Sequence, residues 1–159
     1  MSEKQKIGIY ARALSQKMGG GVKEYVKSLV KSMIKNIDSN TELYIFHNLK
    51  ENYFAGDIKI HKKKNNVIEV NLKSSNKLFC DFVLAPYYVR KLSLDVMWFP
   101  KNVVPFLIPC KAVVTMLDMG YYRPKYNAYS LFSNLYMKPM IKYSCRRAEA
   151  IVSISRFTR

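Results

Sequence analysis

Residues 6–37 decide the fold, and they read KIGIYARALSQKMGGGVKEYVKSLVKSMIKNI. The apolar run at 6–11 is short and nearly continuous, which is typical of a buried strand. From Val22 to Ile37 the apolar residues recur at alternating steps of three and one, and lysines and polar residues fill the other positions. This spacing predicts one apolar face of an α-helix, joined to the strand by a glycine-rich loop.

Gly19, Gly20 and Gly21 lie between that strand and that helix. Glycines at the N-terminus of a helix allow backbone N–H groups to approach an anion closely. Lys23, in the first turn, opposes the helix dipole but would favour a bound phosphate. The loop matches neither the P-loop, which needs Gly-Lys-Ser/Thr, nor the dinucleotide fingerprint G-x-G-x-x-G. Two interpretations remain: an anion site, or a plain turn with a glycine at positive φ.

The rest of the chain alternates between strand and helix patterns. Further strands are predicted at 41–47, 57–61, 67–72, 95–99, 111–117 and 150–154, and helices at 77–92 and 127–148, interrupted by Pro86 and Pro139. This alternation predicts one α/β domain, a Rossmann-like three-layer sandwich with a mostly parallel central sheet. Ligands bind beyond the carboxyl ends of such strands, where the loops 12–21, 100–109 and 118–126 are expected.

Several residues are expected in the core. In the predicted helix 77–92, the apolar face consists of Leu78, Phe79, Phe82, Val83 and Ala85, followed by Tyr88 or Val89. Trp98, the only tryptophan, is expected to pack there too. The cysteines are three, widely spaced and without a CxxC pair, so buried free thiols in a reducing compartment are expected rather than a disulfide or metal site: Cys80, Cys110 and Cys145.

The chain is strongly basic, with a net charge of +16 over 159 residues and a pI near 9.8. This charge predicts an anionic partner, namely a membrane surface, a nucleic acid or a phosphorylated substrate. The alternative is a lysine-rich composition that only solvates the surface. No apolar run reaches about 18 residues, so no bilayer span is expected. The expected location is cytoplasmic, or peripheral on the inner face of the cytoplasmic membrane.

Asp118 ends the most continuous predicted strand, at 111–117. A carboxylate at that edge can accept hydrogen bonds from sugar hydroxyls or act electrostatically. An Asx turn or a helix cap is the structural alternative. Its position at the carboxyl end of a strand favours the functional interpretation. No second carboxylate lies near it in sequence, so a glycosidase pair is not indicated.

The segment 119–148 contains basic residues and tyrosines but no Asp or Glu. Lys138, Lys142 and Arg146 are four residues apart and would form one stripe on a helix, with Arg147 beside it. Such a surface suits anionic lipid headgroups and also single-stranded nucleic acid, of which lipid is favoured. A solvated helix face with half-buried tyrosines is the alternative. The other members of the set are Arg123, Lys125, Tyr121, Tyr122, Tyr126, Tyr129, Tyr136 and Tyr143.

Four segments together resemble family 4 glycosyltransferases of the GT-B type. They are GGGVKEYVKSLVKSM, DVMWFPKNVVPF, KAVVTMLDMGYYRP and RRAEAIVSISRFT, in that order and with matching spacing, whereas residues 49–92 have no counterpart. The resemblance implies a Rossmann-like acceptor domain that faces a second domain holding a nucleotide-sugar. It implies sugar transfer with retention of configuration to a lipid-linked or polysaccharide acceptor, with no cofactor.

The resemblance also assigns roles to residues. It implies that Gly19, Gly20 and Gly21, with Lys23, line the interdomain cleft near the donor phosphates. Asp118 matches the aspartate of the family's His-Asp pair, while Leu117 stands where the histidine would be. Tyr121, Tyr122 and Arg123 would face the acceptor. Ser155 matches the serine that opens the next helix.

The family continues into a C-terminal nucleotide-sugar-binding domain, which the resemblance implies is absent from this chain. The chain alone is therefore expected to be inactive. The alternative function is a non-catalytic basic module that binds nucleic acid or a partner protein. The lack of a recognised nucleic-acid motif counts against it, and the sequence does not indicate an oligomeric state.

Overall fold

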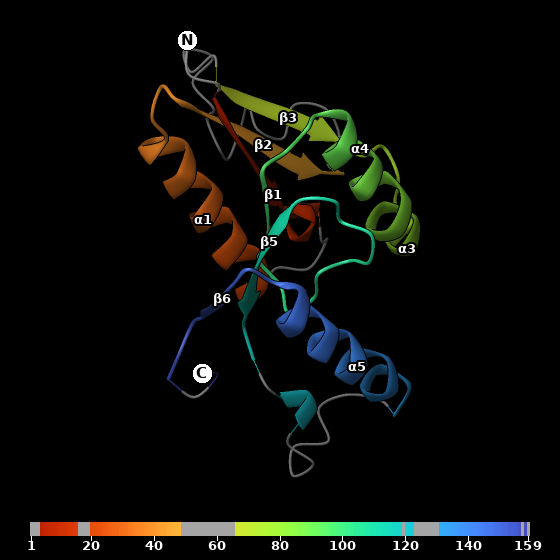
Figure 1. Ribbon diagram of the computed structural model, residues 1–159. Helices are drawn as coiled ribbons and strands as arrows, with labels where there is room; N and C mark the ends of the chain where they lie inside the picture. The colour runs from red at the N-terminus through yellow and green to blue at the C-terminus, as the bar shows by residue number, and fades with distance from the viewer. Residues whose placement is uncertain are drawn as a thin grey trace.

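The computed structural model describes residues 4–15, 20–48, 66–118, 120–122, 131–156 and 158. Its centre is a six-stranded sheet in the order β3-β2-β1-β4-β5-β6, and every neighbouring pair is parallel (Figure 1). The strands are β1 Gln5–Tyr10, β2 Thr41–His47, β3 Val67–Asn71, β4 Val96–Phe99, β5 Lys111–Met116 and β6 Ala150–Ser153. The predicted Rossmann-like α/β class is confirmed, because the order reverses between β1 and β4 as in doubly wound sheets.

Helices cover both faces of the sheet, which makes three layers (Figure 1). On one face lies α1, Gly21–Asn36. On the other lie α5, Leu131–Arg147, and a helical run made of α3 Lys77–Phe79, the π turn η2 Cys80–Leu84 and α4 Ala85–Lys91. Two short 3-10 turns, η1 Arg12–Ser15 and η3 Gly120–Tyr122, follow β1 and β5. None of the helices in the described ranges is long and apolar enough to cross a membrane.

The core is divided by the sheet. Toward α1, Ile9 and Ile45 of the strands pack with Val26 and Val30, all fully buried. Toward α4 and α5 the buried set is larger and includes Phe46, Phe99, Val89 and Ile141. Alternate residues of one strand serve opposite faces. This two-sided burial explains why the strands appear as continuous apolar runs in the sequence.

The strongest sequence patterns were located to within one or two residues. The predicted strand 41–47 has those bounds, and the helix predicted from Val22 begins at Gly21. The predicted helix 127–148 is observed as α5 over 131–147, and residues 127–130 lie outside the described residues. The interruption predicted at Pro139 is wrong, because α5 runs through this residue. The predicted strand 57–61 lies outside the described residues.

The predicted apolar face of residues 77–92 is wrong in part. Leu78, Phe79 and Val83 are exposed, whereas Cys80 and Ala85 face the sheet and are fully buried. The π turn causes this change, because its extra residue rotates the helix so that buried positions follow steps of five and then four. The same turn accommodates Pro86 near the start of α4, where a missing N–H costs little.

Residues 100–110 connect β4 to β5 without a helix, and α5 holds them in place. Ser144 Oγ accepts a hydrogen bond from Val104 N at 2.8 Å. Arg147 Nη2 donates to the carbonyl oxygens of Ile108 and Cys110, both at 2.8 Å. This long loop therefore packs against the helix that follows β5 and has a defined course.

The expectation of three buried thiols is only partly right. All three cysteines are free, but Cys80 alone is buried, Cys110 is intermediate and Cys145 is exposed. Trp98 is half-buried rather than fully enclosed, and its Nε1 donates to Thr115 Oγ1 at 2.9 Å.

Gly8 permits the close packing at the centre of the sheet, where it lies opposite Met97. A Cβ on Gly8 would collide with Met97 Sδ and lie 2.7 Å from Leu94 Cδ1. We therefore expect Gly8→Val to lower the free energy of unfolding by about 1–3 kcal/mol through overpacking, measured by urea denaturation. Gly21→Ala is the control, because a Cβ there meets nothing within 4 Å. Equal stability of the two variants would contradict this account.

Candidate functional site

The candidate site is the edge of the sheet where the strands end. Because β1, β4 and β5 are adjacent and parallel, the loops that follow them share one rim. This confirms the predicted common location of the three loops for their described residues. The start of α1, which follows the first loop, lies at the same rim.

The glycine corner is open. Gly20 is extended, with φ −176° and ψ 162°, a conformation that any residue adopts, so a turn at positive φ is not its explanation. A Cβ on Gly20 or on Gly21 would meet no heavy atom of the described residues within 4 Å. Neither backbone conformation nor packing thus requires glycine at these two positions. Gly19 lies outside the described residues, and the anion site stays a prediction.

One contact links this corner to β5, the strand that precedes Asp118. Tyr25, one turn into α1, places its hydroxyl 3.2 Å from Thr115 Oγ1 of β5. Thr115 is fully buried and also accepts the bond from Trp98. The start of α1 is therefore held against the carboxyl end of β5.

Asp118 forms an Asx turn, since its Oδ1 accepts a hydrogen bond from Gly120 N at 3.0 Å. Buried Asn102 fixes the backbone of the same loop. Its Oδ1 accepts from Leu117 N at 2.8 Å, and its Nδ2 donates to the carbonyl oxygen of Asp118 at 3.3 Å. The structural interpretation of Asp118 is thus observed, and a sugar contact remains a prediction.

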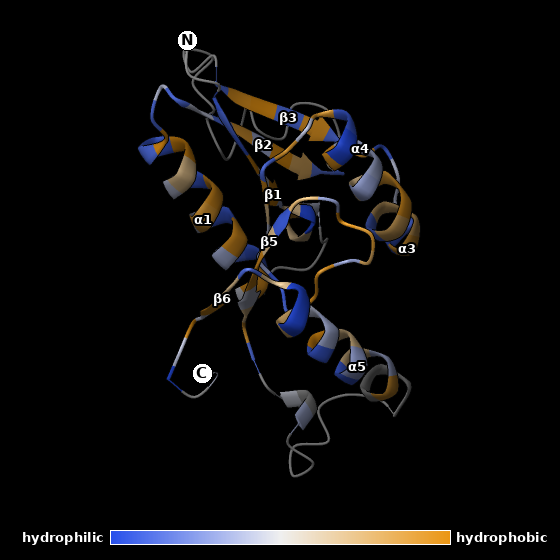
Figure 2. Cartoon of the chain, viewed as in Figure 1, coloured by the Kyte–Doolittle hydropathy of each residue, from blue (hydrophilic) through white to orange (hydrophobic). Residues whose placement is uncertain are grey.

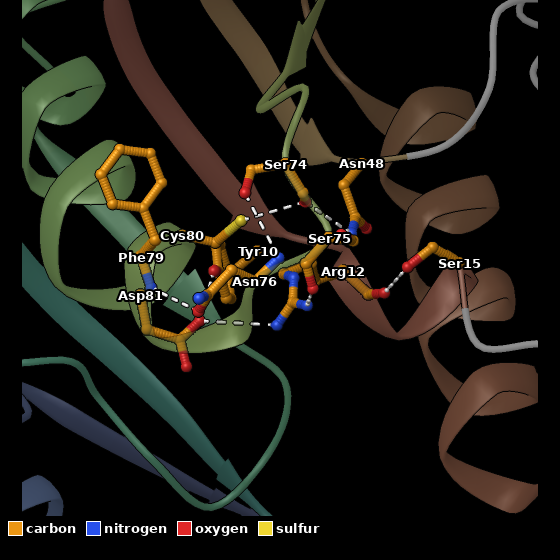
Figure 3. Close-up of polar contacts among 10 residues, drawn as sticks. All are labelled: Tyr10, Arg12, Ser15, Asn48, Ser74, Ser75, Asn76, Phe79, Cys80 and Asp81. Carbon is orange, nitrogen blue, oxygen red and sulfur yellow. Dashed lines mark hydrogen bonds and ion pairs between the residues drawn. The ribbon is translucent and has the colours of Figure 1, made fainter.

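A second polar group occupies the rim after β1, on the face covered by α4 and α5. Tyr10 donates a 2.5 Å hydrogen bond to Asp81 Oδ1, and Arg12 Nη1 lies 3.8 Å from the same oxygen. Arg12 Nη2 also donates to Ser75 O at 3.3 Å. Figure 3 shows the guanidinium of Arg12 extending toward the Asp81 carboxylate between η2 and the segment after β3. Arg12 Nε is buried and has no hydrogen-bond partner among the described residues.

Burial and charge shape the protonation of this group. Burial raises the pKa of Asp81, and the Tyr10 bond with nearby Lys77, Arg12 and Lys101 opposes the rise. Burial and the Asp81 charge raise the pKa of Tyr10, so the phenol stays protonated and donates. Desolvation and then Lys77 lower the pKa of Lys101, while Asp118 and Asp81 counteract this.

Lys101 therefore lies in the fields of both rim carboxylates. It follows β4, so it comes from the loop between the Tyr10–Asp81 pair and the Asp118 turn. Three cations and two carboxylates surround the ends of β1, β4 and β5. Such a rim can bind a phosphate or carboxylate group of a substrate through its cations, while the single proton of the Tyr10 phenol stays committed to Asp81.

The predicted acceptor residues are only partly described. Tyr122 lies in η3, and its hydroxyl donates to Lys138 O at 3.0 Å, which ties η3 to α5. Tyr121 belongs to the same turn, but its side chain lies outside the described residues. Arg123 lies outside them entirely. Of the predicted basic stripe, Lys138, Lys142 and Arg146 are exposed, whereas Arg147 is used to hold the loop 100–110.

Sequence reasoning missed Tyr10, Asp81, Arg12 and Asn102. Tyr10 and Asp81 are 71 positions apart in the sequence, and no local pattern connects them. A lone asparagine after Pro100-Lys101 was the one available signal for Asn102, whose φ of 31° is a conformation that asparagine tolerates. Among the described residues no group of three or more metal-ligating side chains occurs.

Comparison with known proteins shows no related family. No family model matches the sequence, and no curated protein matches it. A dTDP-glucose 4,6-dehydratase of Bacillus anthracis, solved with NAD, aligns at a TM-score of 0.47 and 13% identity over 74% of this chain and 39% of its own. An ADP-L-glycero-D-manno-heptose-6-epimerase of Helicobacter pylori aligns at 0.47 and 16% over 89% and 51%. The chain thus spans about half or less of these enzymes, and likeness of this degree carries no argument about function.

The Tyr10–Asp81–Arg12 group gives a first test of the rim. We expect Asp81→Ala to lower the free energy of unfolding by about 1–3 kcal/mol, because it leaves a buried phenol and a guanidinium without their acceptor. Asp81→Asn should cost less, since an amide oxygen still accepts from Tyr10. Glu149→Ala, at an exposed position, is the control for loss of one negative charge. Urea denaturation decides, and a loss no larger than that of Glu149→Ala would refute the role.

His47, at the end of β2, predicts a pH dependence of stability. Burial lowers its pKa from 6.5 to about 4, although Glu69 Oε2 lies 3.5 Å from Nε2. Because the unfolded chain binds this proton more readily, stability should fall as pH drops through this interval, by about 3 kcal/mol at most. His47→Gln should flatten that part of the curve, measured as urea midpoints across the pH range. Parallel curves for the variant and the wild type would exclude His47 as the cause.

Proposed function

We propose that this chain forms the acceptor-side domain of a retaining glycosyltransferase of the GT-B type. In the proposed reaction, a second domain holds a nucleotide-sugar, and the sugar passes to a hydroxyl of a lipid-linked or polysaccharide acceptor. The bond from the anomeric carbon to the phosphate oxygen breaks, and a bond to the acceptor oxygen forms. The acceptor proton leaves with the departing phosphate.

The observation that carries this proposal is the contact between the Tyr25 hydroxyl and Thr115 Oγ1, which are 3.2 Å apart. It supports the arrangement that the resemblance requires, with the glycine corner and the Asp118 loop on the same rim. The strand order supports the same location for the site, because ligands of doubly wound folds bind where the order reverses, which here is between β1 and β4. The weak structural likenesses do not enter the argument.

Each rim element has a defined part in the proposal. The open backbone at Gly20 and Gly21 presents N–H groups to the donor phosphates. Asp118 accepts hydrogen bonds from sugar hydroxyls with the oxygen that the Asx turn leaves available. Lys101 and Arg12 offset negative charge on an incoming acceptor, and Tyr10 holds the Asp81 carboxylate in place.

Leu117 marks the departure from the family pattern. Its N–H donates to Asn102, so this backbone is already committed, and a leucine side chain offers no polar contact to a sugar. Under the proposal, the rim hydroxyls and the Asp118 carboxylate carry the recognition that a histidine would otherwise share. The Asp118 turn is therefore the point at which the proposal is most easily tested.

Asp118→Asn separates the two roles of this residue. An asparagine oxygen still accepts from Gly120 N and keeps the Asx turn, but the negative charge is lost. In the proposed two-domain enzyme, we expect sugar transfer to fall about 10²–10³-fold with unchanged thermal stability. The measurement is the transfer of labelled sugar from nucleotide-sugars to acceptors in a membrane extract.

The 159-residue chain alone is the negative control, and it should not turn over. Full activity of Asp118→Asn would reduce Asp118 to a structural residue. Robust transfer by the 159-residue chain alone would reject the two-domain mechanism.

A further inference from the structure

An exposed apolar surface covers the outer side of the helical run and the neighbouring loop tip. Leu78 is 57% exposed and Leu107 is 77% exposed. We call this surface the apolar face; its other members are Phe79, Val83, Tyr87 and Phe106, all at least 40% exposed. Figure 2 shows hydrophobic residues on α3 and along the loop that follows β4. Exposed apolar groups that occur together mark an interaction site rather than ordinary surface.

Aromatic contacts make the two parts of this face continuous. Phe82 of the π turn stacks on Phe106, with ring centroids 5.8 Å apart. Phe106 also packs against Tyr143 of α5, at 4.4 Å. The apolar face therefore extends from the helical run, through the loop tip at Phe106, to Tyr143 of α5.

Folding alone does not account for the residues at the loop tip. Leu107 has φ 65°, a left-handed conformation that glycine and asparagine adopt at lower cost. Its side chain is nevertheless large, apolar and mostly exposed. On α5, Leu135 is likewise 77% exposed. Both residues carry apolar surface that nothing in the described part of the chain covers.

Basic residues lie beside the apolar face and on α5, the helix that the face reaches through Tyr143. Lys91 places its ammonium 5.7 Å from the centre of the Tyr87 ring. Lys138, Lys142 and Arg146 are exposed along α5. Between residues 82 and 94, and again between 96 and 117 and between 119 and 148, the sequence has no Asp or Glu. An apolar centre with a basic margin is the pattern of an interfacial membrane contact.

We propose that the apolar face docks onto an anionic lipid membrane, with Leu78 and Leu107 entering the headgroup region and the α5 lysines contacting anionic headgroups. Aliphatic side chains decide between lipid and nucleic acid. Single-stranded nucleic acid is held by aromatic stacking and cations, to which Leu78, Leu107 and Leu135 contribute nothing. A lipid surface, in contrast, can bury all three leucine side chains.

The face lies beside the candidate site. Phe82, which stacks on Phe106 of the apolar face, follows Asp81 of the rim directly in the chain. Docking by this face would place the rim near the membrane surface. The proposal does not require sugar transfer, because vesicle binding is measured without a donor.

The experiment is co-sedimentation of the 159-residue chain with phosphatidylcholine vesicles and with phosphatidylcholine–phosphatidylglycerol vesicles, at low and high salt. We expect binding to the anionic vesicles only, weakened by salt. Leu78→Ser with Leu107→Ser should lower the partition coefficient about tenfold. The matched control, Ile151→Ser with Ile154→Ser, removes two isoleucines of β6 and its end that are 48% and 52% exposed, and it should bind as the wild type does.

A second pair of variants tests the charges. Lys138→Glu with Lys142→Glu should lower binding about tenfold or more, whereas Lys31→Glu with Lys35→Glu makes the same charge change on α1 and should have a much smaller effect. Circular dichroism verifies that each variant is folded.

Four outcomes would overturn the proposal. The first is equal binding to both kinds of vesicle, and the second is wild-type binding by the leucine variant. The third is concentration-dependent dimerisation that the leucine variant abolishes, which would mean that a second copy covers the face. The fourth is salt-sensitive binding of oligonucleotides without binding of vesicles, which would mean that the basic stripe binds nucleic acid and not lipid.

Discussion

The close pairing of β1 with β4 is the constraint on which the rest of the structure depends. Gly8 lies opposite Met97, and the absence of a side chain leaves room for the Met97 and Leu94 side chains. This pair joins the two halves of the sheet, because β2 and β3 extend from β1 while β5 and β6 extend from β4. It therefore sets where the strand order reverses, and with it the rim at which residues from three loops meet.

The rim is held by buried polar groups that arrive from distant parts of the sequence. Asn102 fixes the loop after β5 through three bonds, two of its side chain and one from its own N–H to Thr115 O at 2.8 Å. Asp81 performs the same function after β1 by accepting from Tyr10. Both groups are buried, so their hydrogen bonds are costly to lose. The loops of the candidate site are thus positioned from the interior and not only by their own turns.

How far the sequence predicted this arrangement depends on whether each signal is local. The helix from Val22 and the strand 41–47 follow from periodicity, and Asp118 follows from its place after a strand. The buried face of residues 77–91 does not, because a single π turn changes the register and its cause is packing against the sheet. The Tyr10–Asp81 bond joins positions 71 apart, and only the completed fold brings them together. Asn102 has no partner nearby in sequence other than the strand that it fixes.

The distribution of acidic residues connects the two proposals. Between residues 76 and 148 the only carboxylates are Asp81, Asp95 and Asp118, and each is occupied within the fold. Asp81 accepts from Tyr10, Asp95 Oδ2 from Lys6 N at 2.8 Å, and Asp118 from Gly120 N. Tyr10 and Arg12 hold Asp81 at the end of β1, and Asp118 follows β5 in its own turn, whereas Asp95 lies at the start of β4, on the opposite edge of the sheet. The fold therefore uses the few carboxylates of this half of the chain internally, and α4 and α5 contain no Asp or Glu, so the exposed lysines and arginines of these two helices have no acidic neighbour on their own helix.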